Sequence, residues 1–180
     1  MTKKIYIFII VVVSIVLVSC GSTIVTETYT GTGGDIIDGV NTFTIDVPDE
    51  GWVLDVFEIT LTDLNYAVAS DLLIRAEKVD SHRVTLIDQR AGTNSFTGTY
   101  TFVDNSDEAG LSRIVTYTGV IVPEVYQSEA DFGIFEETVL TGTWQLTILD
   151  WTAENNGTLG SWSIELEYDE RSPENQNSLL

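Results

Sequence analysis

Residues 142–168 read GTWQLTILDWTAENNGTLGSWSIELEY, and they carry the clearest strand pattern of the chain. It contains two runs in which apolar and polar side chains alternate, separated by a loop rich in glycine, asparagine and acidic residues. A period of two is typical of strands that have one buried and one exposed face. The side chains expected to face a core are Trp144, Leu146 and Ile148 in the first run and Trp162, Ile164, Leu166 and Tyr168 in the second. We therefore predict two half-buried strands that each contribute a tryptophan to one shared core.

The same alternation recurs upstream in short runs that are bounded by turn residues. These runs are 43–47, 53–61, 72–76, 84–87, 97–103 and 113–118. In the run 53–61, the pattern places Val53, Phe57 and Ile59 on one face and Val56 on the other. Many short strands spaced about ten residues apart favour a sandwich or a barrel. No stretch sustains a helical period, so the pattern predicts an all-β domain of about eight strands.

Several short motifs follow one another in a specific order along residues 40–168. They are Val47-Pro48-Asp49, Asp71-Leu72-Leu73-Ile74, Phe102-Val103-Asp104, Gly142-Thr143-Trp144, Gly157-Thr158-Leu159 and Trp162-Ser163. Together they resemble the P domain (P/Homo B module), which accompanies the catalytic domain of subtilisin-like proprotein convertases. The resemblance implies a jelly-roll-like β-sandwich of about eight or nine antiparallel strands, expected over residues 35–168. It also implies a non-catalytic module, because it covers none of the convertases' catalytic motifs.

The N-terminus has the features of a bacterial lipoprotein signal. Lys3 and Lys4 precede an apolar run, 5–18, that is shorter than the ~20 residues a membrane span needs. The run ends in Leu17-Val18-Ser19-Cys20, which resembles a lipoprotein cleavage box, and Cys20 is the only cysteine of the chain. We predict a cleaved signal peptide over 1–19 and lipid attachment at Cys20. An uncleaved anchor helix is the alternative.

Composition indicates which partners to expect. The chain has 28 acidic and 8 basic residues and a formal net charge of −20. Such a surface repels phosphates, which excludes nucleic acid as a partner and leaves membrane contact to the lipid on Cys20. The residue after Cys20 is Gly21, not aspartate, and this choice resembles the sorting signal for the outer membrane. The expected location is therefore the bacterial cell envelope, at the outer membrane or cell surface.

Two flanking segments are expected to lie outside the folded core. Residues 20–34 are rich in serine, threonine and glycine and are predicted to form a flexible tether, although a mild alternation at Ile24 and Tyr29 allows an edge strand. The polar tail 169–180 is predicted to be disordered.

No catalytic constellation is evident, so we do not expect an enzyme. His82 is the only histidine, and it lies in the polar turn Asp80-Ser81-His82-Arg83 without a Gly-x-Ser-x-Gly motif anywhere in the chain. One histidine and one cysteine do not make a zinc site. Close carboxylate pairs are expected by chance among 28 acids, so they do not predict a glycosidase.

Calcium is the one cofactor that the sequence favours. The run Asp104-Asn105-Ser106-Asp107-Glu108 supplies the oxygen ligands that Ca²⁺ requires. The resemblance to P domains makes Asp71, Asp104 and Asp107 candidate ligands, with Asp150 more remote. The alternative is a solvated acidic loop.

Aromatic residues near loops suggest a second kind of site. Trp151 and Tyr126 are candidates for stacking on a sugar ring or a protein partner, and the alternative is that they close the ends of the sandwich. Two functions are therefore expected. The first is a lipid-anchored accessory or protein-interaction module, linked to proteolysis by a secreted subtilisin-like serine protease in trans. The second is a carbohydrate-binding or adhesive surface module.

Overall fold

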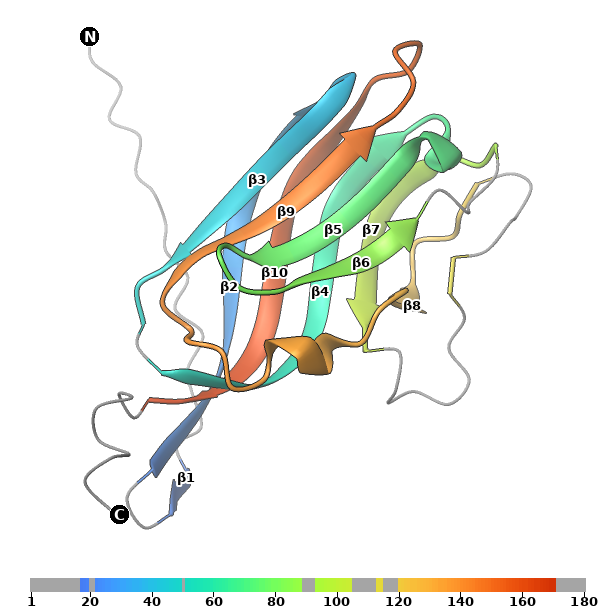
Figure 1. Cartoon of the computed structure of the whole chain (residues 1–180). Coiled ribbons are helices and arrows are strands. Elements are labelled where there is room, and N and C mark those ends of the chain that lie inside the picture. The colour runs from blue at the N-terminus through green and yellow to red at the C-terminus, as the bar shows by residue number, and fades with distance from the viewer. Residues whose placement is uncertain are drawn as a thin grey trace, which may run out of the picture.

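Two β-sheets pack face to face in the computed structural model, which describes residues 17–19, 22–49, 51–88, 93–104, 113–114 and 120–170 (Figure 1). The first sheet has the strand order β1-β2-β10-β4-β7-β8, and the second has the order β3-β9-β5-β6. The predicted all-β sandwich is confirmed. No helix among these residues is long and apolar enough to cross a membrane.

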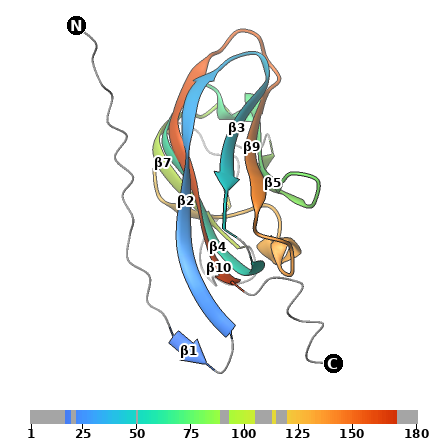
Figure 2. The ribbon, with the colours of Figure 1, turned by 90° about the vertical axis from the view of Figure 1, so that its left-hand side faces the viewer.

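The strands follow the sequence runs closely. Their bounds are β1 Leu17–Ser19, β2 Ser22–Ile36, β3 Gly39–Val47, β4 Trp52–Tyr66, β5 Leu72–Lys78, β6 Arg83–Asp88, β7 Phe96–Val103, β8 Val125–Gln127, β9 Gly142–Asp150 and β10 Gly157–Asp169. Two short 3-10 helices, η1 Ala69–Asp71 and η2 Phe132–Phe135, lie between strands. Figure 2, a view turned by 90°, shows the two sheets as separate layers.

The two alternating runs within residues 142–168 belong to different sheets. β9 lies in the four-stranded sheet, while β10 lies in the six-stranded sheet. All the residues predicted to face the core are buried, with Trp144 and Trp162 both at 0% exposure. Each run therefore supplies the inner face of one layer, and the two tryptophans fill the space between the layers.

One face assignment in β4 is wrong. Val56 is buried and Phe57 is 38% exposed, the reverse of the predicted alternation. The register between β4 and β10 shifts at this point, because Glu165 pairs with Glu58 while Leu166 pairs with Val56. β-bulges at Phe57 and at Leu54, where a second shift leaves Glu167 paired with Asp55 and Tyr168 with Val53, each insert one extra residue. The side chains between the two bulges therefore lie on the faces opposite to those predicted.

The predicted flexible tether is also wrong for its described residues. Ser22 onward forms β2, which pairs with β10 in an unbroken antiparallel register from Ile24 to Ile36. Threonine-rich sequences favour strands, and Val25 and Tyr29 contribute to the core. Gly31 permits the close packing, because an added Cβ would lie 2.8 Å from Trp162 Nε1.

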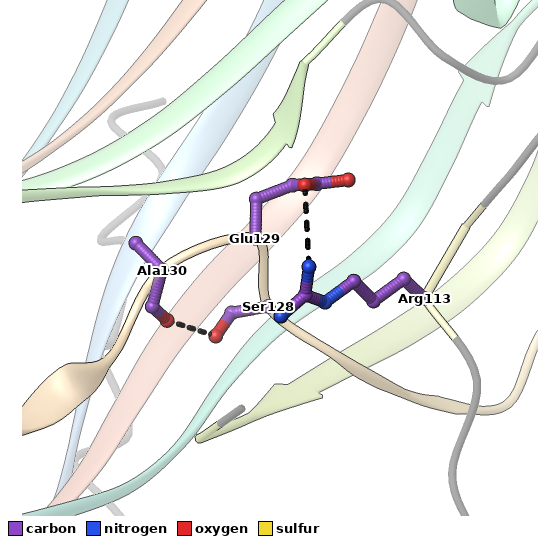
Figure 3. Close-up of polar contacts among 4 residues, drawn as sticks. All are labelled: Arg113, Ser128, Glu129 and Ala130. Carbon is purple, nitrogen blue, oxygen red and sulfur yellow. Dashed lines mark hydrogen bonds and ion pairs between the residues drawn. The ribbon is translucent and has the colours of Figure 1, made fainter. Parts of the chain in front are cut away.

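The region around β8 departs from the predicted antiparallel arrangement. β8 pairs with β7 in parallel. Of the predicted strand 113–118, Arg113 makes an isolated bridge to Gln127, and 115–118 fall outside the described residues. Figure 3 shows two polar contacts that hold the chain after β8: Arg113 Nη1 lies 4.0 Å from Glu129 Oε2, and Ser128 Oγ donates to the carbonyl of Ala130.

The C-terminal tail is predicted from the sequence to be disordered from residue 169 onward. Asp169 still belongs to β10, whereas 171–180 lie outside the described residues.

Candidate functional site

Three connections meet at one end of the sandwich, the upper end in Figure 1. They are the turn 37–38 between β2 and β3, the helix η1, and the loop 151–156 between β9 and β10. The strand register brings them together, because Asp150 pairs with Gly39 on one side and with Leu72 on the other. We call this region the loop end.

A buried asparagine fixes the β2–β3 turn. The side chain of Asn41 is 8% exposed, and its Oδ1 accepts a hydrogen bond of 3.1 Å from the backbone N–H of Ile37. Its Nδ2 donates to the carbonyls of Ile37, at 2.7 Å, and of Ile148, at 3.2 Å. Asn41 thus joins the turn to β9 and leaves the Ile37 side chain, 57% exposed, pointing into solvent from a fixed backbone.

Two aspartates fix the β9–β10 loop. Asp150 Oδ1 accepts from the N–H of Thr152 at 3.0 Å, and Asp71 Oδ2 accepts from Asn155 Nδ2 at 3.1 Å. The carbonyl of Asp71 also accepts from the N–H of Trp151 at 3.0 Å. These bonds hold the loop on both sides of Trp151, whose side chain is 59% exposed.

The acidic character of the loop end is visible in the pKa of a neighbouring tyrosine. Burial, and then the nearby carboxylates of Asp150, Asp71 and Asp38, raise the pKa of Tyr66. A negative field disfavours formation of the phenolate. Tyr66 therefore keeps its proton, and its hydroxyl donates to the carbonyl of Asn155 at 3.5 Å.

An apolar row crosses the outer face of the four-stranded sheet beside these loops. Leu149 of β9 pairs with Val40 of β3 and with Leu73 of β5. Val40 is 69% exposed and Leu149 is half-buried, while Leu73 is buried although it lies outside the main core. With Trp151 one position beyond Asp150, these side chains form an apolar patch on a surface where polar residues are expected.

An open hollow of about 430 Å³ lies on the other sheet at the same end. Its lining includes Asp35, Ile37 and Asn156. Asp35, Thr158 and Asn65 are cross-strand neighbours there, so the hollow has a polar floor with Ile37 at its rim. The loop end can therefore contact a partner through both apolar and acidic groups.

The structure brings together only some of the predicted calcium ligands. Asp71 and Asp150 lie at the loop end, whereas Asp104 lies at the far end of β7. Val103, the residue before Asp104, pairs with Glu58 of β4, and Glu58 is roughly 25 Å along β4 from Tyr66, which lies at the loop end. Asp104 is buried and accepts from the N–H of Phe132 at 3.0 Å. Asp107 lies outside the described residues. Grouping Asp71 with Asp104 in one site is thus wrong, and no cluster of three or more metal-binding side chains occurs among the residues described.

The remaining predicted residues have different outcomes. Tyr126 is 3% exposed and donates to the carbonyl of Val122 at 2.8 Å, so it is part of the packed interior and does not face a ligand. His82 lies in the exposed turn after β5, with Nδ1 2.8 Å from Ser81 Oγ. Cys20 lies outside the described residues, so its lipidation stays a prediction.

The opposite end carries a hydrogen-bonded group of tyrosines and carboxylates. Tyr29 Oη lies 3.2 Å from both Glu27 Oε2 and Asp49 Oδ2, and Tyr168 donates to the same Glu27 oxygen at 3.2 Å. Burial raises the pKa of Tyr29 and raises the pKa of Tyr168 to about 12. The side chains of this group are buried or half-buried, so this end shows internal polar packing.

Comparison with known proteins found a likeness of fold to solved structures. The chain matches the crystal structure of an Aeromonas sobria serine protease in complex with its chaperone, with a TM-score of 0.52 and 14% identity over 82% of this chain and 27% of that chain. The crystal structure of the A. sobria serine protease matches with a TM-score of 0.48 and 16% identity, over 81% of this chain and 27% of that one. No family model and no curated protein matches the chain. The likeness shows a shared fold, and this chain spans about a quarter of the matched chains, so the P-domain resemblance itself stays a prediction.

Proposed function

We propose that the chain is a lipid-anchored, non-catalytic module that binds and supports a secreted subtilisin-like serine protease in trans, at the outer membrane or surface of a bacterial cell. The observation that carries the proposal is the fold likeness to a chain of the A. sobria protease–chaperone complex. The matched region is about a quarter of that chain, as expected for an accessory domain. The fixed loops and exposed apolar side chains of the loop end supply a surface for such a partner.

The test uses the full chain, purified in neutral detergent, and each secreted subtilisin-like protease of the same bacterium. Each protease is refolded with and without the chain, and its active yield and its complex with the chain are measured. We expect at least one protease to give a higher active yield and a defined complex. If no protease gains activity or binds, the proposed partner is wrong.

Lipid attachment is tested separately. Cys20→Ser should abolish incorporation of labelled palmitate and move the protein from the membrane fraction to the soluble fraction. Thr23→Ser serves as the matched control and should leave both properties unchanged. Membrane association that survives Cys20→Ser would instead support the uncleaved anchor helix.

Calcium is proposed as a stabilising ion at the loop end. Asp150 is 2% exposed, and its Oδ2 accepts no hydrogen bond among the described residues, while Asp71, the last residue of η1, directly precedes Leu72, the β5 partner of Asp150. An unpaired buried carboxylate oxygen is costly, and a cation would supply the missing interaction. Millimolar Ca²⁺ should raise the melting temperature of the wild-type chain, and the increase should be lost in Asp71→Asn. Equal melting curves with calcium and with chelator would exclude the ion.

A carbohydrate-binding or adhesive function is the second candidate, because Trp151 presents an exposed aromatic side chain on a fixed loop. Retention on a glycan array that is lost in Trp151→Ala, with unchanged folding, would support it. An array without any retained glycan would count against it.

A further inference from the structure

The outer face of the four-stranded sheet changes character along its length. Residues paired across the four strands form rows on this face. The two rows farther from the loop end are polar, and they consist of Thr42, Thr147, Arg75 and Thr85 and then of Thr44, Gln145, Glu77 and Arg83. The row nearest the loop end is instead Val40, Leu149 and Leu73, with Asp88 at its far edge. A row of aliphatic side chains on the outer face, exposed at Val40 and half-buried at Leu149, is unexpected on a face whose other rows are polar.

We propose that this apolar row, with Trp151 beside it, is a docking surface for another protein that presents aliphatic side chains rimmed by lysine or arginine. The proposal rests on the proposed function, because it identifies the surface and the partner chemistry through which the module acts. Exposure supports it: Val40 and Trp151 are 69 and 59% exposed, and Leu149 between them is half-buried. Large apolar side chains exposed to this degree gain free energy when a partner removes them from water.

The charge around the row determines which partner fits. Asp88 ends the row, Asp71 precedes the strand that carries Leu73, and Asp38 precedes the strand that carries Val40. Residues 35–39, 69–71 and 151–156 contain no lysine, arginine or histidine. Among the described residues, Arg75 is the basic group nearest to the row in the strand register, and it lies in the adjoining row toward the middle of the sheet. An acidic rim around an apolar centre complements a partner with a basic rim.

The same charges argue against a second copy of this chain as the occupant. Each copy has a formal net charge of −20, and an isologous contact would bring two acidic rims together. A basic partner covers the apolar row and neutralises the rim in the same contact. The row is therefore better matched to a different protein.

The surface is also preorganised. Asn41 fixes the backbone at Ile37, and the bonds that Asp71 accepts from Asn155 and from the Trp151 N–H fix the loop beside the row. Val40 and Leu149 lie on paired strands. Side chains on a rigid backbone lose little conformational entropy on binding, which is a property of residues that contribute most to an interface.

The direct test measures binding of a defined probe to the full chain in neutral detergent. The probe is a short fluorescein-labelled peptide of alternating lysine and leucine, and its fluorescence anisotropy is followed at physiological salt, where screening limits contacts between distant charges. The comparison peptides replace leucine by serine or lysine by glutamate. We expect the lysine–leucine peptide to bind at least tenfold more tightly than either comparison peptide.

The matched variants separate the row from general acidity. Val40→Thr with Leu149→Thr removes apolar surface while keeping residues that favour strands, and it should weaken binding at least tenfold. Glu58→Gln with Glu165→Gln removes two charges from the other sheet and should change binding less than threefold. Circular dichroism and thermal melting confirm that both variants are folded. Equal weakening by the two variants, or equal binding of the lysine–serine peptide, overturns the proposal.

The protease refolding assay distinguishes this proposal from the proposed function. If a protease is supported equally well by wild type and by Val40→Thr with Leu149→Thr, the protease role stands and the assigned surface is wrong. If the peptide binds at the row but no protease is supported, the surface stands and the protease is the wrong partner. Glycan retention that depends on Trp151, with no peptide binding at the row, also overturns the docking surface.

Discussion

The outer faces of the two sheets differ, although their inner faces are built in the same way. On the six-stranded sheet, outward positions of the central strands β4 and β10 carry mostly polar or acidic residues, with the partly exposed Leu54 and Phe57 of β4 as apolar exceptions, and Glu58 lies directly opposite Glu165. On the four-stranded sheet, the corresponding outward position next to the loop end is the apolar row centred on Leu149. Inside, each sheet contributes a fully buried tryptophan, Trp144 or Trp162. The core thus accounts for the stability of both layers, while the difference outside indicates where contact with a partner is expected.

The acidic pair shows that the six-stranded face tolerates unfavourable electrostatics. Burial and then the neighbouring Glu165 raise the pKa of Glu58. Like charges directly opposite on adjacent strands destabilise a sheet. The strands still pair, because burial of their apolar inner face stabilises the sheet far more than the repulsion between Glu58 and Glu165 destabilises it.

The largest expected effect tests whether the two layers share one core. Trp144→Ala and Trp162→Ala should each lower the free energy of unfolding by about 3–5 kcal/mol, because each leaves a cavity between the sheets. Ser163→Ala, next to Trp162 on the outer face, should cost less than about 0.5 kcal/mol. Urea denaturation measures all three. A tryptophan substitution that costs no more than Ser163→Ala would show that its sheet contributes little to the core.

Alkaline pH should destabilise the protein through tyrosines of the six-stranded sheet. Among the described residues, the tyrosines with raised pKa lie in that sheet, and they are Tyr29, Tyr66, Tyr100 and Tyr168. A raised pKa means that the folded state keeps a proton which the unfolded state loses near pH 10. Their contribution is therefore complete below pH 10 and is lost as pH rises toward the folded pKa, which is about 12 for Tyr168. The slope should be about 1.4 kcal/mol per pH unit for each tyrosine.

Urea midpoints between pH 8 and 11, together with tyrosinate absorbance, check this expectation. Tyr168→Phe should give a shallower decline than wild type. Tyrosinate that appears near pH 10 while the protein is still folded would contradict it.

The hydrogen bond between Asn155 and Asp71, which holds the β9–β10 loop, should contribute moderately to stability and should clearly restrict the motion of that loop. Asn155→Ala removes the hydrogen bond to Asp71 and should cost about 1 kcal/mol. The N–H of Trp151 should then exchange faster with solvent, because the loop is held on one side only. The exposed neighbour provides the control, since Asn156→Ala should change neither property. Unchanged exchange at Trp151 in Asn155→Ala would mean that the loop is fixed by other contacts.

The smallest expected effect has the opposite sign. Glu165→Gln should raise the free energy of unfolding at neutral pH by about 0.2–1 kcal/mol, because it removes the repulsion of Glu58. Since the pKa of Glu58 is raised, its charge weakens the fold at neutral pH and this penalty disappears as Glu58 is protonated in acid. The gain should therefore vanish near pH 4. Glu154→Gln, in the exposed loop, is the control, and an equal gain there would indicate a general charge effect.

The strands and most of their faces could be predicted from sequence, because alternation reflects burial one residue at a time. The bulge at Phe57 could not, since a one-residue insertion is defined only by pairing with β10. The tether prediction failed for a related reason: threonines of β2 are neutral in hydropathy and become strand only through pairing with β10. The apolar row does have a signal in the sequence. Leu73 and Leu149 each follow an apolar residue on the opposite face, which breaks the alternation in two runs that turn out to be neighbours.

The candidate sites depended even more on three-dimensional packing. Asp71 and Asp150 are 79 positions apart in sequence, yet Asp71 directly precedes Leu72, the partner of Asp150. Asp104, assigned to the same calcium group, follows a strand that runs away from them. Tyr126 was expected near a ligand because it lies beside loops, but it is buried against Phe102 and Tyr100.

The all-β class, the extent of most strands and the inward direction of both tryptophans follow from the local period of apolar residues, so they can be predicted from the sequence. The placement of β9 and β10 in opposite layers, the inclusion of β2 in a sheet, and the shared surface of Val40, Leu149 and Leu73 become evident only in the folded molecule. Those properties depend on which strands pair and in what register. Pairing is a contact between residues far apart in the chain, so no local pattern specifies it.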